Sequence, residues 1–245
     1  MAGFDETGFR VEGGLQWVHC ARTGKYTLLM VHPRRGKQAI EAMGVLPSFA
    51  GVAVHDAWAP YDTYTSADHQ LCCAHALREL QAITDLAPEG EWCWATQAAT
   101  ALTQMQKLVS EAISQDRDAV DQAALATQIH RLRSAALVGA SQTAARSAVL
   151  MRKHHALARR LLDRQDDYLR FTWDRRVSPD NNGTERDIRM AKLRQKVSGS
   201  MRTRTGARHF CAIRSYLSTA AKHGLSFFDA LVMLTEGQPW MPATA

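Results

Sequence analysis

The sequence has no long uninterrupted apolar run, no internal repeat and no low-complexity tract. No stretch reaches the roughly 18 uncharged apolar residues that a membrane span needs. The N-terminus also lacks the basic-then-apolar layout of a secretory signal. We therefore expect no membrane association and a cytoplasmic location. The five cysteines are an odd number at irregular spacing, which is typical of reduced thiols, and no paired C-x-x-C set for structural zinc is present.

What the sequence does contain is enough apolar surface for folding and an uneven distribution of charge. Of its 245 residues 46% are hydrophobic, which suffices for one large core, or for one core plus a helical subdomain. The net charge is +6, and residues 181–245 contain 10 Lys or Arg against 4 Asp or Glu, whereas residues 1–180 contain 20 of each. A basic C-terminal segment is typical of proteins that bind a polyanion, but also of a solvated helix face.

The first third of the chain alternates predicted strands with predicted helices. Glycine turns at Gly13-Gly14 and Gly24-Lys25 separate three β-type segments and predict an antiparallel meander. A helical pattern followed by a short apolar run then predicts a strand added in parallel. The expected strands are 4–12, 15–23, 26–32, 51–55 and 69–73, and the expected helices are 36–46 and 74–86.

Residues 89–167 carry no strand signal, only helical periodicity, and we interpret the region as an all-helical insertion. The break at Val177-Ser178-Pro179-Asp180 ends it, because a residue before proline is pushed out of helical geometry. A new helix is expected to start near Asn181 or Asn182. The expected parts are a first core segment at 1–88, the insertion at 89–176, a last core segment with basic helices at 177–237 and a tail at 238–245. The fold class is therefore α/β, a mixed sheet flanked by helices.

Three carboxylates occupy positions expected of metal ligands. Asp5 lies within the first predicted strand, Asp56 follows the fourth, and Glu185 lies in the first turns of the helix after the insertion. Neighbouring strands and an adjoining helix can bring such side chains together, and two hard divalent cations about 3.5–4 Å apart need such oxygen ligands. Singly, each carboxylate is better interpreted as a surface charge.

The helix that begins near Asn182 combines Glu185 with a row of cations at three- and four-residue steps. Such a row suits contacts to DNA phosphates that do not read sequence. The alternative is a solvated face whose cations pair with Asp174, Asp187 or acids of the insertion. The candidate DNA-binding residues are Arg186, Arg189, Lys192, Arg194, Lys196, Arg202, Arg204 and Arg208.

Several short motifs occur in a fixed order along the chain. They are Asp5-Glu6-Thr7-Gly8, Arg34-Arg35-Gly36, Gly51-x-x-x-His55-Asp56, Cys72-x-Ala74-His75-x-x-Arg78, Asn181-Asn182-x-x-Glu185-Arg186-x-Ile188-Arg189 and Lys196-Val197-Ser198-Gly199. Each alone is weak evidence. Together, with a helical insertion before the glutamate, they resemble the DDE transposases of the IS66 insertion-sequence family.

This resemblance implies an RNase H-like fold in which Asp5, Asp56 and Glu185 match the catalytic triad. It implies Mg²⁺ as cofactor, with Mn²⁺ as a substitute, and DNA strand cleavage and strand transfer as the activity. The implied partners are the DNA of the element ends and target, further copies of the chain on that DNA, and accessory proteins of the same element. Cys72, His75 and Arg78 match a motif that the resemblance brings near the active site. A packed cysteine beside a hydrogen-bonded histidine is favoured there over zinc, since two residues supply at most half a tetrahedral site.

The chain also departs from the family pattern. Only four residues precede Asp5, and no helix-turn-helix or zinc finger is recognisable, so we expect recognition of the element ends to lie outside this polypeptide. Cys73 stands where the family often has an aromatic residue. Two other functions remain open: a catalytically silent DNA-binding or assembly remnant, and a nuclease that shares the metal geometry.

Overall fold

The computed structural model describes residues 1–117 and 119–243, which form two compact units. The first unit combines Met1–His69 with the chain from Asn181 onward, and the second is Gln70–Asp180. The tail expected at 238–245 therefore ends outside the described residues. Within those residues no helix is both long enough and apolar enough to cross a membrane.

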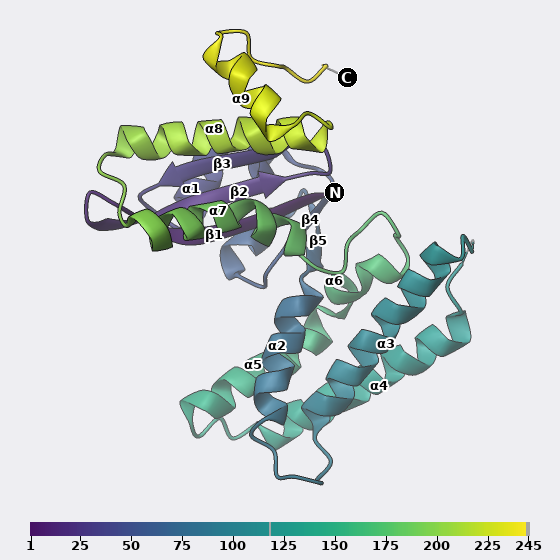
Figure 1. Ribbon diagram of the computed structural model, residues 1–245. Helices are drawn as coiled ribbons and strands as arrows, with labels where there is room; N and C mark the ends of the chain where they lie inside the picture. Colours follow the sequence, from purple (N-terminus) through teal and green to yellow (C-terminus); the bar gives the residue numbers. More distant parts are fainter. Residues whose placement is uncertain (118, 244–245) are drawn as a thin grey trace. The chain divides into compact units, whose positions relative to one another are not determined.

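The described strands form a five-stranded mixed sheet in the order β3-β2-β1-β4-β5 (Figure 1). β2 pairs antiparallel with both β1 and β3, whereas β4 pairs parallel with β1. The predicted meander and the parallel addition are therefore confirmed. The strands are β1 (Ala2–Val11), β2 (Gly14–Arg22), β3 (Thr27–His32), β4 (Val52–His55) and β5 (Asp68–Leu71).

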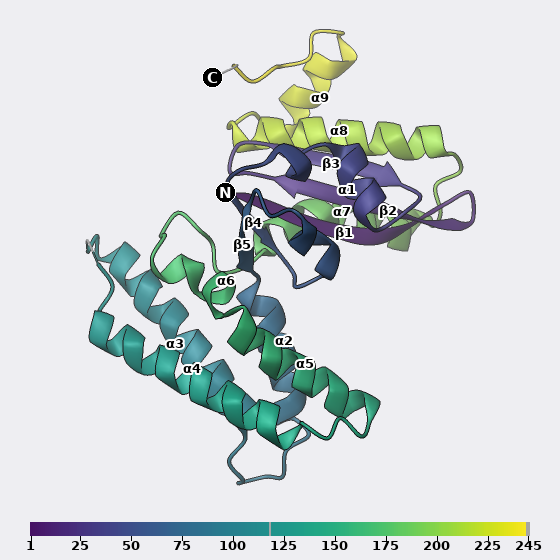
Figure 2. The ribbon, with the colours of Figure 1, turned by 180° about the vertical axis from the view of Figure 1, so that it is seen from behind.

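Helices cover both faces of this sheet. α7 (Asn182–Ser198) packs on β1 and β2 and α8 (Arg204–Lys222) on β3, while α1 (Lys37–Met43) lies on the opposite face (Figures 1 and 2). Successive side chains of a strand point to opposite faces. Phe9 and Val11 of β1 belong to the core beneath α7 and α8, and Phe4 belongs to the core on the α1 side. By this alternation Asp5 lies on the α7 face and Glu6 on the α1 face.

The rest of the first unit consists of two short 3-10 helices and a C-terminal helix. Thr203 caps the N-terminus of α8 by accepting a hydrogen bond from the Gly206 backbone at 3.0 Å. This cap explains why α8 begins at Arg204. The remaining elements are η1 (Leu46–Ser48), η2 (Ala59–Thr63) and α9 (Phe227–Thr235), the last packed on α8 through Leu217, Ala220 and Ala230.

The described secondary structure of the second unit is helical, apart from Gln70 and Leu71, the last two residues of β5. Leu80, Leu102, Met105, Leu132 and Leu157 are almost fully buried, so the unit has its own core. The unit includes α2, which packs against α3 and α5. Its elements are α2 (Cys73–Thr84), α3 (Trp94–Ser114), α4 (Gln122–Gln142), α5 (Val149–Asp163), α6 (Gln165–Leu169) and η3 (Arg170–Thr172).

Candidate active site

Asp5 and Asp56 are carried by neighbouring parallel strands. β1 and β4 pair with Gly3 opposite Val54, and each aspartate lies two residues beyond that pair. Asp56 follows the last residue of β4, and its Oδ1 accepts a hydrogen bond from the Trp58 backbone at 3.1 Å. Oδ1 of Asp5 accepts one from the Glu6 backbone at 2.9 Å. Asp5 and Asp56 therefore lie at the same level along neighbouring strands, where the charge of Asp56 acts on Asp5.

The surroundings of Asp5 oppose its ionisation. Burial raises its pKa from 3.8 to about 7, and the charges of Glu6 and Asp56 act in the same direction. The Glu6 backbone hydrogen bond and the positive charge of Lys192 act against this shift without cancelling it. A negative charge at Asp5 therefore lacks full compensation from the protein, and a bound cation would supply it.

Glu6, on the other face of β1, forms a buried polar cluster that the sequence reading did not identify. The Glu6 side chain is 2% exposed; its carboxylate lies 2.6 Å from Nη2 of Arg35 and accepts a hydrogen bond from the Tyr61 hydroxyl. The Arg35 guanidinium lies 4.2 Å from the centre of the Trp58 ring. Burial raises the pKa of Glu6, whereas Tyr61 and Arg35 lower it. The cluster holds the segment after Asp56 against the sheet. Two of the motifs, Asp5-Glu6-Thr7-Gly8 and Arg34-Arg35-Gly36, contain its charged residues.

Glu185 is positioned by the N-terminus of α7, which lies directly on β1. The buried Asn181 side chain donates a 2.7 Å hydrogen bond to the Phe4 carbonyl oxygen, next to Asp5. Thr184 Oγ1 donates in turn to Asn181 Oδ1 at 2.5 Å. A Cβ at Gly3 would lie only 2.2 Å from Thr184 Oγ1, so the close approach requires glycine. The Asn-Asn-x-x-Glu motif therefore brings the first turn of α7, with the half-buried Glu185, to the strand that carries Asp5.

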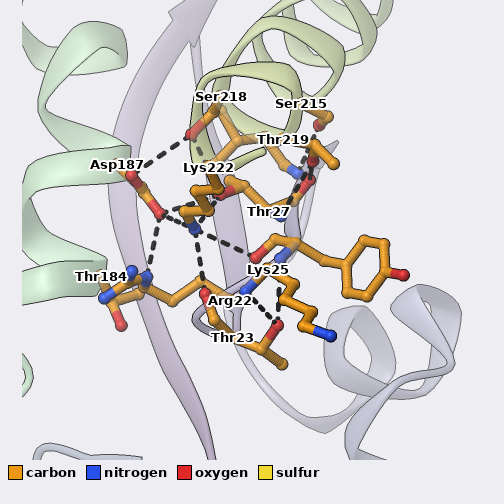
Figure 3. Close-up of polar contacts among 12 residues, drawn as sticks. Arg22, Thr23, Lys25, Thr27, Thr184, Asp187, Ser215, Ser218, Thr219 and Lys222 are labelled. Carbon is orange, nitrogen blue, oxygen red and sulfur yellow. Dashed lines mark hydrogen bonds and ion pairs between the residues drawn. The ribbon is translucent and has the colours of Figure 1, made fainter. Parts of the chain in front are cut away.

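A polar network fixes the next turn of α7 (Figure 3). Asp187 accepts hydrogen bonds from Lys222 Nζ at 2.8 Å and Thr27 Oγ1 at 2.9 Å, and Arg22 Nε lies 3.1 Å away. Thus α7 is tied to β2, β3 and α8 at one place. Asp187 is engaged here, and Asp174 pairs with Arg176 of its own unit. Neither acid neutralises the basic row of α7.

Most of the predicted DNA-binding cations are exposed to solvent. Arg194 differs, because it is half-buried and donates a 2.8 Å hydrogen bond to the Gly199 carbonyl oxygen at the end of α7. Among residues 1–117 and 119–243, none of the other seven forms an ion pair with an acid. These seven are Arg186, Arg189, Lys192, Lys196, Arg202, Arg204 and Arg208.

The three predicted triad residues belong to the same unit, but their carboxylate oxygens do not lie together as a compact set of metal ligands. Within the described part of the chain, only one group of three has all its ligand atoms within 4.8 Å of one another, and it consists of His55, Asp62 and His69. Asp5, Asp56 and Glu185 are therefore more widely spaced than this.

Cys72, His75 and Arg78 belong to the second unit. Cys72 is buried just before α2, and Arg78 is exposed and donates to the Ala74 carbonyl oxygen of its own helix at 3.3 Å. A role for these three residues near the predicted triad stays a prediction.

The sheet, the carboxylates of β1 and β4 and the exposed cations of α7 define a mixed α/β protein with an acidic site beside a basic helix. A family model described as Transposase IS66 family matches residues 1–209. The chain therefore belongs to the IS66 transposase family, and membership indicates a transposase function. No curated protein and no solved structure matches the chain.

Proposed function

We propose that the chain is the catalytic part of a DDE-type transposase with an RNase H-like core. In this proposal Asp5, Asp56 and Glu185 bind divalent metal while DNA strands are cut and joined. The observation that carries the proposal is geometric: the register of β1 and β4 sets Asp5 and Asp56 two residues beyond the same pair, and the contact of Asn181 with Phe4 brings the start of α7 to β1. The pKa of Asp5, raised to about 7 mainly by burial, adds support. Catalytic carboxylates commonly stand in such perturbed environments.

The donor set fits Mg²⁺, for which Mn²⁺ substitutes. Three carboxylates offer hard oxygen ligands, which these ions prefer, and a cation would compensate the charge that burial disfavours at Asp5. The bound metal would activate the attacking oxygen and stabilise the leaving 3′ oxygen of an in-line phosphoryl transfer. The protein's own part is to hold the carboxylates on rigid elements. Asn181 fixes the helix that carries Glu185, and the Trp58 backbone fixes Asp56.

The exposed cations of α7 supply the DNA contact in this proposal. Arg189, Lys192 and Lys196 follow Glu185 along the helix and are exposed. Because Asp187 is engaged by Arg22 and Lys222, it does not neutralise the cations beside it. Phosphates can therefore bind along α7 while the reacting bond lies over the carboxylates.

The test is nicking of supercoiled plasmid and cleavage of DNA that carries element ends, in Mg²⁺ and in Mn²⁺. We expect Asp5→Asn, Asp56→Asn and Glu185→Gln each to abolish cleavage, because each removes a ligand charge at nearly constant volume. Glu236→Gln, an exposed change at the end of α9, is the matched control and should cleave normally.

Normal cleavage by one of the three variants would remove that residue from the triad. Metal-independent DNA binding without cleavage in the wild-type chain would favour a silent binding module instead. Circular dichroism of each variant separates loss of chemistry from loss of fold.

A further inference from the structure

Two histidines and an aspartate converge at the end of β4, outside the predicted triad. His55 is the last residue of β4, Asp62 lies in η2 and His69 lies in β5. One ligand atom of each lies within 4.8 Å of the other two, and Nε2 of His55 is 2.9 Å from Nδ1 of His69. On a tetrahedral zinc ion two imidazole nitrogens lie about 3.3 Å apart, since each Zn–N bond is about 2.0–2.1 Å long. Little movement therefore separates this pair from a metal-binding arrangement.

The His55 ring is already oriented as a ligand. Its Nδ1 donates a hydrogen bond to the backbone carbonyl oxygen of Asp56, so in the neutral ring the lone pair lies on Nε2, which faces His69. Metal-binding histidines typically donate their second N–H to a carbonyl or carboxylate in this way. The ring is fully buried and packs on Tyr61, with 4.7 Å between ring centres. Its orientation is therefore fixed before any metal binds.

The chemistry of the donors selects the metal. Two imidazole nitrogens and one carboxylate oxygen suit zinc and similar transition metals, whereas Mg²⁺ prefers oxygen ligands alone. Asp62 and His69 are less buried than His55, so the cluster reaches toward solvent on their side. We propose that His55, Asp62 and His69 form a zinc site, separate from the proposed magnesium site at Asp5, Asp56 and Glu185.

Zinc at this position would act on the structure around Asp56. It would join the end of β4 to η2 and to β5, the neighbour of β4 in the sheet. Because His55 also donates to the Asp56 carbonyl oxygen, the ion would hold the backbone of that aspartate. The role we assign is therefore structural, and it does not depend on the proposed transposase chemistry.

The experiment is a Zn²⁺ titration of the full chain after removal of metal by a chelator, followed by calorimetry and by a competing chromophoric chelator. We expect one equivalent to bind and to raise the melting temperature. Asp62→Asn and His69→Gln should each weaken Zn²⁺ binding by at least roughly 10- to 100-fold. That is the effect of losing an outer-shell partner of a metal ligand, and these variants remove a ligand itself. Substitution with Co²⁺ should give a visible spectrum of tetrahedral type in the wild type and lose it in both variants.

Matched controls come from exposed residues of the same types. Asp68→Asn, one residue before His69, and His130→Gln on α4 should bind Zn²⁺ as the wild type does. Asp5→Asn should also retain it, which separates this site from the magnesium site. The proposal is overturned if the folded wild-type chain binds no Zn²⁺. Binding that survives both Asp62→Asn and His69→Gln, or that is lost in Asp5→Asn instead, would overturn it equally.

Discussion

Asp5 is a buried carboxyl group whose ionised form is opposed by its surroundings, and this has a consequence for stability. Its pKa is raised from 3.8 to about 7, so between these values the folded chain binds a proton that the unfolded chain releases. The free energy of unfolding contributed by Asp5 is therefore fully present below about pH 4 and is lost as pH rises through about 7. Without metal, the wild type should be less stable at pH 8 than at pH 5 for this reason.

Asp5→Asn should remove this dependence. At pH 8, without divalent metal, we expect the variant to be more stable than the wild type by roughly 1–4 kcal/mol, given about 1.4 kcal/mol per pKa unit. Urea unfolding at pH 5 and pH 8 measures this difference in the free energy of unfolding. At pH 8, Mg²⁺ should restore the stability of the wild type and leave that of Asp5→Asn unchanged. Equal pH dependence in the two proteins would contradict the assigned pKa.

At the scale of elements, the contact between the N-terminus of α7 and β1 depends on Gly3. A methyl group there would lie 2.2 Å from Thr184 Oγ1, so Gly3→Ala must displace the first turn of α7 and with it Glu185. We expect a loss of stability of about 1–3 kcal/mol from overpacking. Cleavage should fall by about 100-fold, since a shift of about 1 Å at a catalytic group can have that effect.

Gly14→Ala is the control for this change, because its new methyl group would come no closer than 3.6 Å to the Val11 carbonyl oxygen. Plasmid nicking and urea unfolding of the two variants are compared. Full cleavage by Gly3→Ala would show that the position of α7 on β1 does not control the reaction.

The exposed cations of α7 give a second prediction at this scale. Lys192→Ala and Lys196→Ala should each weaken DNA binding to a similar degree for unrelated sequences. Each should also reduce the slope of log affinity against log salt by about 0.9, the value for one lost phosphate contact. Fluorescence anisotropy between low and moderate salt measures both. Lys107→Ala on α3, an exposed lysine paired with Glu111, should leave the slope unchanged; sequence-selective weakening would refute a phosphate role.

Local patterns predicted most elements, but not the contacts between them. The glycine turns and the alternation of side chains correctly indicated β1 to β3, and the break at Pro179 indicated the start of α7. The predicted strand at 69–73 ends at Leu71, because Cys73 begins α2 and its backbone N–H bonds to the Pro179 carbonyl oxygen at 2.8 Å. That partner is distant in sequence and leaves no local signal.

In the candidate site, too, sequence patterns indicated residues but not the contacts between them. The family motifs pointed to Asp5, Asp56 and Glu185, and their roles stay proposals. Sequence gave no sign that Asn181 bonds to Phe4 or that Glu6 is buried against Tyr61, since both contacts depend on tertiary packing. His55, Asp62 and His69 follow one another at seven-residue steps, but only the path from β4 through η2 to β5 makes them neighbours.

At the scale of the whole molecule, each of the two units buries a core of its own. Phe9 and Val18 lie in the core of the first unit, and Leu102 and Leu132 in that of the second. The predicted metal ligands Asp5, Asp56 and Glu185 all belong to the first unit. A ligand stabilises only the part of a protein that binds it, by an amount set by its concentration relative to its Kd.

Differential scanning calorimetry should therefore show two transitions, because separate cores unfold with limited mutual dependence. Mn²⁺ at about 100 times its Kd should stabilise the first unit by roughly 2.7 kcal/mol and leave the other transition in place. Asp5→Asn should abolish the shift. A substitution of Trp94, which is buried in the second unit, assigns the two transitions. It should alter the transition that Mn²⁺ leaves unmoved. A single transition that moves as a whole with Mn²⁺ would show instead that the helical unit and the sheet unit unfold together.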